Sequence, residues 1–358
     1  MASQYTVKQL KEGLTQLGFK APYGMLKADL VKYYEGAVYM VQNSIPKTNP
    51  NRDKVITYTP VVSDPKLSMM EHLSLYGWAI DKVPNYNPED IRNMFLAWLH
   101  KVCDEFDPKD SDTWNRENVP YRDRGLLRRW IGHSDFVWKT RIACIPIFEK
   151  IWGTKDLLTS FDGGAFMKSL RYGKEYKTKH WMHCDQGRDI THFACVQGVV
   201  NLFENGPLDG GTILVSGAQH KFVEYINKHP VDGIGRLFPI DPFDPILKDC
   251  QIVKPCLKPG EILLFDSRVF HCNTNPKSNN PRMCIYVSMM PRQYCGQEDL
   301  NKRIKAFEEG RTTCHWAYGP EFSVVPLSSN PLYSKGLPVP KQVETTVLTE
   351  DMKKLIGY

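Results

Sequence analysis

The feature that most constrains the fold is the long stretch 161–290, in which short strand-like segments alternate with turns rich in glycine, proline and asparagine. Such alternation predicts an all-β sandwich or barrel. Helical patterns precede it: Asn87 and Pro88 supply a cap and a first helical position, and a second helical pattern covers 134–152. We therefore expect an α+β protein whose core is a jelly roll of the cupin-like type, supported by flanking helices.

Composition and charge narrow the class of protein. The chain has 358 residues, of which 42% are hydrophobic and 24% charged, and its net charge of +6 is too small to imply nucleic-acid binding by itself. No apolar run is long enough to cross a membrane, and the N-terminus shows no signal-peptide pattern. The ten cysteines are scattered without a Cys-x-x-Cys pair, which favours reduced thiols. We expect an intracellular protein, nuclear or cytoplasmic, that does not bind membranes.

The N-terminal segment 1–42 predicts a small helical hairpin, with Thr6 as a cap and Gly18 at the end of the first helix. It resembles the SAP motif, a helix-turn-helix unit of many chromatin and DNA-repair proteins, although one extra residue separates Gly24 from Lys27. The resemblance implies DNA binding through residues 5–35. The phosphate contacts would come from Lys8, Lys11, Lys20, Lys27 and Lys32. The alternative is a structural hairpin whose lysines are only solvated.

The chain then divides into further segments. Residues 43–65 are polar and rich in proline, which is typical of a linker. Residues 66–330 contain the helical and strand patterns of the main domain, and 331–358 form a C-terminal tail.

His183 and Asp185 lie two residues apart, so on a strand both side chains face one side and can reach the same ion. His271 follows the run 259–270, which predicts a tight turn, a buried strand and a polar rim, and it is the candidate for the third ligand. Two histidines and one carboxylate leave three positions open, as Fe(II) requires for a bidentate 2-oxo acid and dioxygen. Arg282, at the start of the next strand, can bind the distal carboxylate of 2-oxoglutarate with two hydrogen bonds.

His180 lies three residues before His183 and would therefore face the opposite side of the same strand. His192, His220 and His315 lack a carboxylate at ligand spacing, and we expect them to be structural or to support the ligands from behind.

This set of residues resembles the phytanoyl-CoA dioxygenase-like superfamily of iron- and 2-oxoglutarate-dependent oxygenases, from about Tyr76 to Arg292. The matching segments are 181–185, 199–202, 205–208 and 211–221, with Phe265, Asp266, His271 and Arg282. The resemblance implies a double-stranded β-helix that holds Fe(II) and uses O2. It also implies conversion of 2-oxoglutarate to succinate and carbon dioxide, coupled to hydroxylation of an unactivated C–H bond.

Single positions refine what the resemblance implies. Halogenating relatives replace the aspartate by a small residue, so Asp185 implies hydroxylation. Gln197 matches a position that often faces the cosubstrate. Two positions depart from the pattern: Cys284 stands where many relatives have serine or threonine, and 216–220 replaces a Pro-Gly-Ser-His segment.

The fold does not identify the primary substrate. Trp181 and Lys168 are candidates for substrate contacts near the metal, although packing alone would also explain Trp181. The segment 310–316 suits either an anionic or planar ligand or a buried aromatic lid.

Three hypotheses about function follow. The first is a hydroxylase acting on nucleic acid or a chromatin-associated protein. The second is a hydroxylase of lipids, amino acids or natural products, with a structural N-terminal hairpin. The third is a binding protein with a vestigial site, which the intact set of four site residues disfavours.

Overall fold

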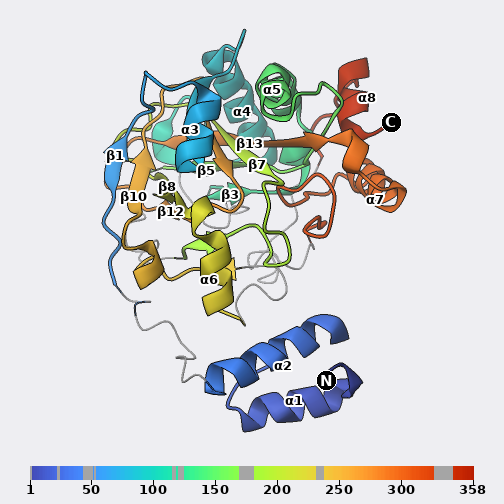
Figure 1. Ribbon diagram of the computed structural model, residues 1–358. Coiled ribbons are helices and arrows are strands. Elements are labelled where there is room, and N and C mark those ends of the chain that lie inside the picture. Colours follow the sequence, from blue (N-terminus) through green and yellow to red (C-terminus); the bar gives the residue numbers. More distant parts are fainter. Residues whose placement is uncertain are drawn as a thin grey trace.

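The structure, a computed structural model, describes residues 2–21, 25–42, 51, 54–114, 118–119, 125–168, 181–230, 238–325 and 342–358. Two sheets lie face to face, and helices cover the outside (Figure 1). Every strand pair is antiparallel except β1 with β10, which is parallel. The expected α+β fold with a double-stranded β-helix core is therefore confirmed.

The major sheet has seven strands and the minor sheet six. The major sheet runs in the order β2 (Trp78–Lys82), β11 (Glu261–Asp266), β7 (Val196–Asn201), β13 (Arg282–Pro291), β5 (Gly164–Met167) and β3 (Leu126–Leu127), with β4 (Leu157–Thr159) also paired to β13. The minor sheet runs β1 (Thr59–Val61), β10 (Gln251–Pro255), β8 (Gly211–Ser216), β12 (His271–Thr274), β6 (His183–Cys184) and β9 (Phe238–Pro239).

Alternation along β13 shows how the sequence assigns its side chains to two faces. Met283, Ile285 and Val287 belong to the large apolar cluster that includes residues of the covering helices. Cys284 and Tyr286 instead pack in the cluster between the two sheets. Because side chains alternate along a strand, Arg282 falls on the same inner face as Cys284 and Tyr286.

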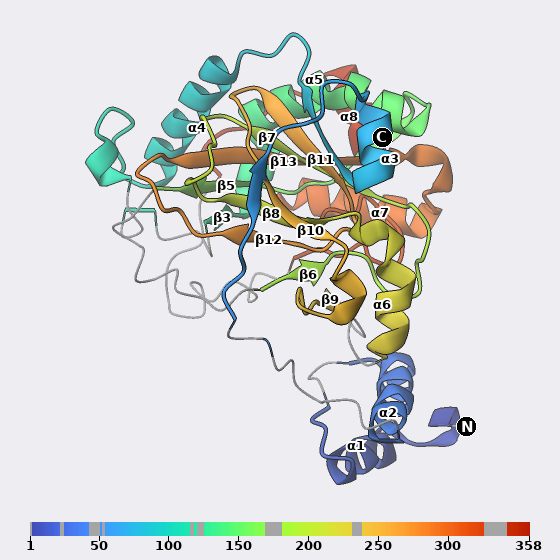
Figure 2. The same cartoon turned by 60° about the vertical axis from the view of Figure 1, so that its left-hand side comes forward.

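Helices cover the outer faces of both sheets. Figure 2 shows α4, α5 and α8 over the major sheet, while α6 lies by the minor sheet. The sequence signals for helix ends are reproduced: Thr6 and Asn87 cap their helices through side-chain hydrogen bonds to backbone N–H groups. The helices are α1 (Val7–Gln16), α2 (Lys27–Gln42), α3 (Met69–Tyr76), α4 (Pro88–Val102), α5 (Asp135–Trp152), α6 (Phe222–Lys228), α7 (Gln297–Glu308) and α8 (Glu350–Ile356). No helix in the described ranges is long and apolar enough to cross a membrane.

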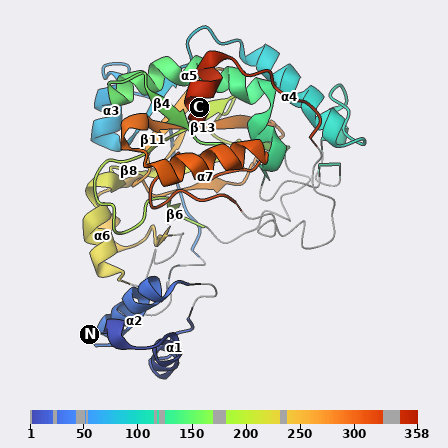
Figure 3. The same cartoon turned by 90° about the vertical axis from the view of Figure 1, so that its right-hand side faces the viewer.

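The N-terminal hairpin, α1 and α2, has a small core of its own and stands below the β core on the side of α6 (Figure 1, Figure 3). That core includes Leu10, Leu14 and Leu30. Lys32 of α2 pairs with Asp189, in the loop that follows β6. The hairpin therefore reaches the main domain at this loop.

Three segments differ from the expectations in detail. The sequence of 76–80 predicts a short strand. In the structure the strand begins two residues later, because Tyr76 ends α3 and Gly77 turns the chain in the left-handed region. The stretch expected as a linker, 43–65, contains β1, which pairs with β10; residues 43–50, 52 and 53 lie outside the described part. The stretch expected as a tail, 331–358, contains α8, which buries three apolar side chains, while 326–341 lie outside the described part.

Gly77 and Gly153 form a matched pair for a stability test. Both end a helix with positive φ, +77° and +68°. A Cβ on Gly77 would lie 2.3 Å from the Oε1 atom of Gln219 and 2.5 Å from Val269, whereas a Cβ on Gly153 would meet nothing within 4 Å. We predict that G153A lowers the free energy of unfolding by about 1–2 kcal/mol, the cost of the left-handed conformation. G77A should cost roughly 1–3 kcal/mol more because of overpacking. Urea denaturation of both variants measures the difference, and equal losses would contradict the close approach at Gly77.

Candidate metal centre and cosubstrate site

Two neighbouring strands of the minor sheet bring the candidate ligands together. His183 and His271 stand directly opposite each other in the antiparallel pair β6–β12, and their ring centroids are 4.4 Å apart. Three possible ligand atoms, one each from His183, Asp185 and His271, lie within 4.8 Å of one another. Two local details differ from the sequence prediction: β6 ends at Cys184, so Asp185 lies in the following bend, and His271 begins β12 rather than ending β11.

Backbone carbonyls fix the orientation of both imidazoles. Nδ1 of His183 lies 3.0 Å from the carbonyl oxygen of Trp181, and Nδ1 of His271 lies 3.0 Å from that of Val269. A carbonyl can only accept, so Nδ1 must carry the proton in each ring. The lone pair of each Nε2 then faces Asp185, at 3.4 Å from Oδ1 for His183 and 3.3 Å from Oδ2 for His271. This is the tautomer that binds a metal through Nε2.

The protonation states also suit a divalent metal. Burial, followed by the charge of neighbouring His271, lowers the pKa of His183 to about 4. Burial alone would raise the pKa of Asp185, but the charges that the surrounding histidines, His183 first, carry when protonated hold it well below its usual value. A metal ligand must be a neutral imidazole or an ionised carboxylate, and both conditions are met near neutral pH. The residues present therefore fit Fe(II).

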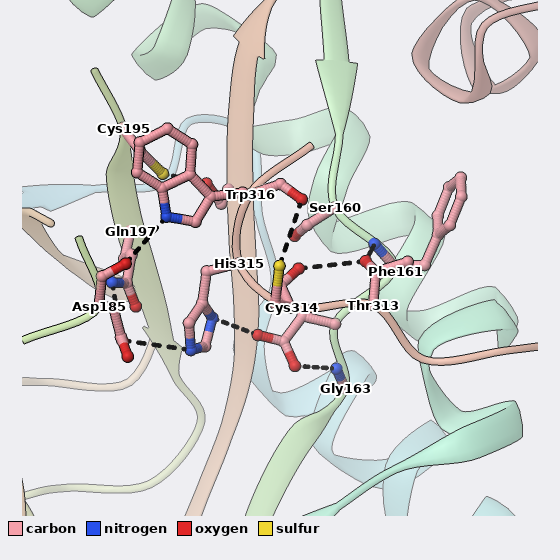
Figure 4. Close-up of polar contacts among 12 residues, drawn as sticks. Ser160, Phe161, Gly163, Asp185, Cys195, Gln197, Thr313, Cys314, His315 and Trp316 are labelled. Carbon is pink, nitrogen blue, oxygen red and sulfur yellow. Dashed lines mark hydrogen bonds and ion pairs between the residues drawn. The ribbon is translucent and has the colours of Figure 1, made fainter. Parts of the chain in front are cut away.

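Asp185 has further contacts that its sequence neighbourhood does not reveal. Gln197 Nε2 donates to Oδ2 at 3.0 Å, and Trp316 Nε1 donates to the backbone oxygen of Asp185 at 3.0 Å (Figure 4). His315 Nε2 lies 3.6 Å from Oδ2, while its Nδ1 pairs with Asp162. The segment 310–316, for which the sequence left two alternatives open, thus contacts Asp185. No local spacing signals these contacts, because His315 and Trp316 are far from Asp185 in the chain.

The environment of His315 favours its cationic form. Burial alone would lower the pKa of His315, but the charge and hydrogen bond of Asp162 and the charge of Asp185 raise it to about 9. A ring between two carboxylates can donate from both nitrogens only when it carries both protons.

Arg282 is the first residue of β13 and is buried on its inner face. Its Nη1 atom finds no hydrogen-bond partner in the described ranges of the chain. Burial alone would lower the pKa of Arg282, but Cys284 and Tyr286 raise it. Native proteins rarely leave a buried donor unpaired without a functional reason. A buried guanidinium with one unpaired Nη1 fits the carboxylate of 2-oxoglutarate.

The remaining candidates are placed as follows. The Trp181 ring stacks on His183, with ring centroids 4.7 Å apart. Lys168 follows β5, donates to the backbone oxygen of Ser111 and lies 3.7 Å from Asp112, so its amino group is engaged by this turn. Substrate contacts by Trp181 and Lys168 stay predictions, as does a cosubstrate contact by Gln197.

Of the other histidines singled out from the sequence, only His315 contacts the ligand set in the described part of the chain. His192 is exposed, and Nε2 of His220 lies 3.2 Å from the carbonyl oxygen of Leu75. His180 lies outside the described residues.

Replacing His271 by alanine tests the candidate metal centre. We predict that H271A weakens Fe(II) binding by at least about 100-fold, because it removes one of three donors. The exposed His192 provides the control, and H192A should bind Fe(II) as the unaltered chain does. Anaerobic calorimetric titration measures both affinities. Equal binding by the two variants would remove His271 from the metal site.

Comparison with known proteins gives two relatives whose matches each cover 62% of this chain. The chain is 30% identical over 234 residues to "Ava biosynthesis cluster protein O" of Aspergillus versicolor, a match that covers 62% of this chain and 75% of the relative. It is 22% identical over 263 residues to a protein of Dictyostelium discoideum named "Putative phytanoyl-CoA dioxygenase". That match covers 62% of this chain and 74% of the relative. No protein-family model matches, so the resemblance of the N-terminal hairpin to a SAP motif gains no support there.

Solved structures with a similar fold have low sequence identity to this chain. The epimerase SnoN, in complex with Fe3+, alpha ketoglutarate and nogalamycin RO, is 14% identical, covers 62% of this chain and 82% of its own, and has a TM-score of 0.43. EctD from S. alaskensis, with 2-oxoglutarate and 5-hydroxyectoine, is 15% identical to this chain. The match covers 69% of this chain and 83% of EctD, with a TM-score of 0.41. From its curated relatives and its His-Asp-His site, the chain belongs to the phytanoyl-CoA dioxygenase-like family of iron- and 2-oxoglutarate-dependent oxygenases.

Proposed function

We propose that this oxygenase hydroxylates a small organic molecule of the natural-product class. The observation that carries the oxygenase chemistry is the His183–Asp185–His271 set in the same β core as the buried Arg282, whose Nη1 has no hydrogen-bond partner in the described ranges. The substrate class is supported by the relative from Aspergillus versicolor, whose name places it in a biosynthesis cluster.

We assign the ligand roles residue by residue. His183 and His271 would bind Fe(II) through Nε2, and Asp185 through its carboxylate, while Arg282 would bind the distal carboxylate of 2-oxoglutarate. When bound, Fe(II) and 2-oxoglutarate together activate dioxygen for insertion of oxygen into a C–H bond. Asp185 occupies the position that halogenating relatives leave open, which supports hydroxylation.

The protein's own residues orient these groups and exclude water. The carbonyls of Trp181 and Val269 hold the two imidazoles in the tautomer that presents Nε2. His183, His271 and Arg282 are each less than 10% exposed, so charges at the site are poorly screened by solvent. The stacked ring of Trp181 restricts rotation of His183. Such preorganisation keeps the reacting groups in place without cost at the moment of reaction.

The N-terminal hairpin supports the small-molecule alternative over nucleic acid. Two of the five lysines expected to contact phosphate have partners within the protein: Lys8 lies 3.9 Å from Glu12, and Lys32 pairs with Asp189. No comparison supports a nucleic-acid substrate. We therefore propose that 1–42 is an accessory module that packs on the oxygenase domain, and that this domain includes β1 and α8 in addition to the stretch 66–330.

Substitution of Arg282 tests the cosubstrate assignment. We predict that R282K raises KM for 2-oxoglutarate by about 10–100-fold, because an ammonium cannot reproduce the two parallel hydrogen bonds of a guanidinium. R282Q should raise it further, since it also removes the charge. Fe(II) affinity should stay close to that of the unaltered chain. Succinate formation at varied 2-oxoglutarate measures KM, and an unchanged KM in both variants would exclude this role.

A metabolite screen tests the substrate class. The full chain, with Fe(II), 2-oxoglutarate and a fungal or soil-microbial metabolite extract, should yield a product heavier by one oxygen atom together with succinate, detected by mass spectrometry. D185A serves as the blank. Added duplex DNA should neither gain oxygen nor change the rate of succinate formation. Oxygen found on DNA and absent from every metabolite would favour the nucleic-acid hypothesis instead.

A further inference from the structure

Asp185 is held differently from the two histidines. His183 and His271 lie in strands and pair with each other across the ladder. Strand β6 has two residues and ends at Cys184, so Asp185 lies in the bend beyond the ladder. A ladder fixes the direction of a side chain through alternation, and a bend does not. The position of this carboxylate must therefore depend on contacts from elsewhere.

Those contacts come mainly from one distant segment, residues 311–325, which we call the 311–325 loop. It follows α7 and passes beside Asp185 (Figure 4). Trp316 of this loop donates to the backbone oxygen of Asp185 at 3.0 Å. His315 of the same loop places Nε2 at 3.6 Å from Oδ2 of Asp185. The loop thus contacts both the backbone and the carboxylate of one residue.

The loop is anchored firmly enough to act as a support. Thr313 forms two hydrogen bonds with Phe161. Its hydroxyl oxygen accepts from the backbone N–H of Phe161, and its own backbone N–H donates to the carbonyl oxygen of Phe161. Val325 closes the far end by donating to Thr312 at 2.9 Å. The base of the loop is therefore tied to the segment that connects β4 and β5.

The ring of His315 is also oriented from behind. Its Nδ1 pairs with Asp162, whose own Oδ1 accepts from the N–H of Gly163 at 2.8 Å. Arg141, which is fully buried, donates to the backbone oxygen of Asp162 at 3.0 Å. The Asp162 carboxylate is thus held at Nδ1 of His315, and Nε2 of the same ring lies on the side of Asp185.

We propose that His315 is a positioning residue for the metal-binding carboxylate of Asp185, oriented by Asp162 and carried by the 311–325 loop. This inference rests on the proposed metal site. His315 and Gln197 both lie against Oδ2 of Asp185, at 3.6 Å and 3.0 Å, whereas Oδ1 lies 3.4 Å from Nε2 of His183. Groups that hold a ligand from behind commonly change metal affinity by about 10–100-fold when removed.

Two amide side chains separate this role from a purely structural one. The amide nitrogen of glutamine lies about where Nε2 of histidine lies, whereas that of asparagine lies about where Nδ1 lies. H315Q therefore keeps a donor toward Asp185 and loses the contact with Asp162. H315N keeps the contact with Asp162 and loses the donor toward Asp185. Both variants are neutral and both lose the ring, so they form a matched pair.

The test measures Co(II) binding by the full chain under anaerobic conditions, with the ligand-field absorption spectrum as a second readout. We expect H315N to weaken Co(II) binding by about 10–100-fold and to alter the spectrum, and H315Q to lie closer to the unaltered chain. Equal affinities and spectra for all three proteins would overturn the proposal. So would a larger loss in H315Q than in H315N, because the contact with Asp162 would then be the important one.

Thermal unfolding without metal shows whether each variant is folded. If H315N does not fold, H315L, which has no donor at either position, takes its place in the comparison with H315Q under the same criteria. Failure of the unaltered chain to bind Co(II) would reject the proposed metal site itself, which distinguishes that outcome from a failure of the role of His315.

Discussion

The register between β6 and β12 is the constraint on which the site depends. It places His183 directly opposite His271, so that both imidazoles project from one face of the minor sheet. A slip of one residue would turn either side chain to the opposite face, because side chains alternate along a strand. The register is held in turn by β8 on the other side of β12, where His271 pairs with Leu214.

Apolar packing outside the two sheets keeps polar groups inside. Behind the minor sheet, Cys184 and Cys272 flank the two histidines in sequence and are buried among residues of α6. Behind the major sheet, Met283 and Ile285 flank Cys284 and are buried with residues of the covering helices. A methionine or isoleucine side chain contributes roughly 1.5–3 kcal/mol to stability when fully buried. Turning one of these strands over would expose this apolar surface and bury charge without a partner, so the fold and the site stabilise one orientation together.

The charges at the centre of the fold are arranged for ligands rather than for stability. His183 is kept neutral and Asp185 ionised, while Arg282 is buried with a donor atom that has no partner in the described ranges. Buried groups of this kind cost free energy unless something binds them. Their cost is consistent with a site that binds a divalent metal and a dicarboxylate. His315 is the exception, since both of its nitrogens already face carboxylates.

The sequence alone predicted the candidate ligand set, the candidate arginine, the class of fold and the ends of a few helices, namely the start of α1, the start of α4 and the extent of α5. Those features are recorded locally: a two-residue spacing, a capping residue, a glycine after the first helix and the alternation of apolar side chains. Tertiary structure decided that Asp185 lies beyond its strand and that His315 and Trp316 contact it. It also decided that β1 and α8 join the folded core. These contacts join segments that are distant in the chain, and local periodicity carries no information about which distant segments meet.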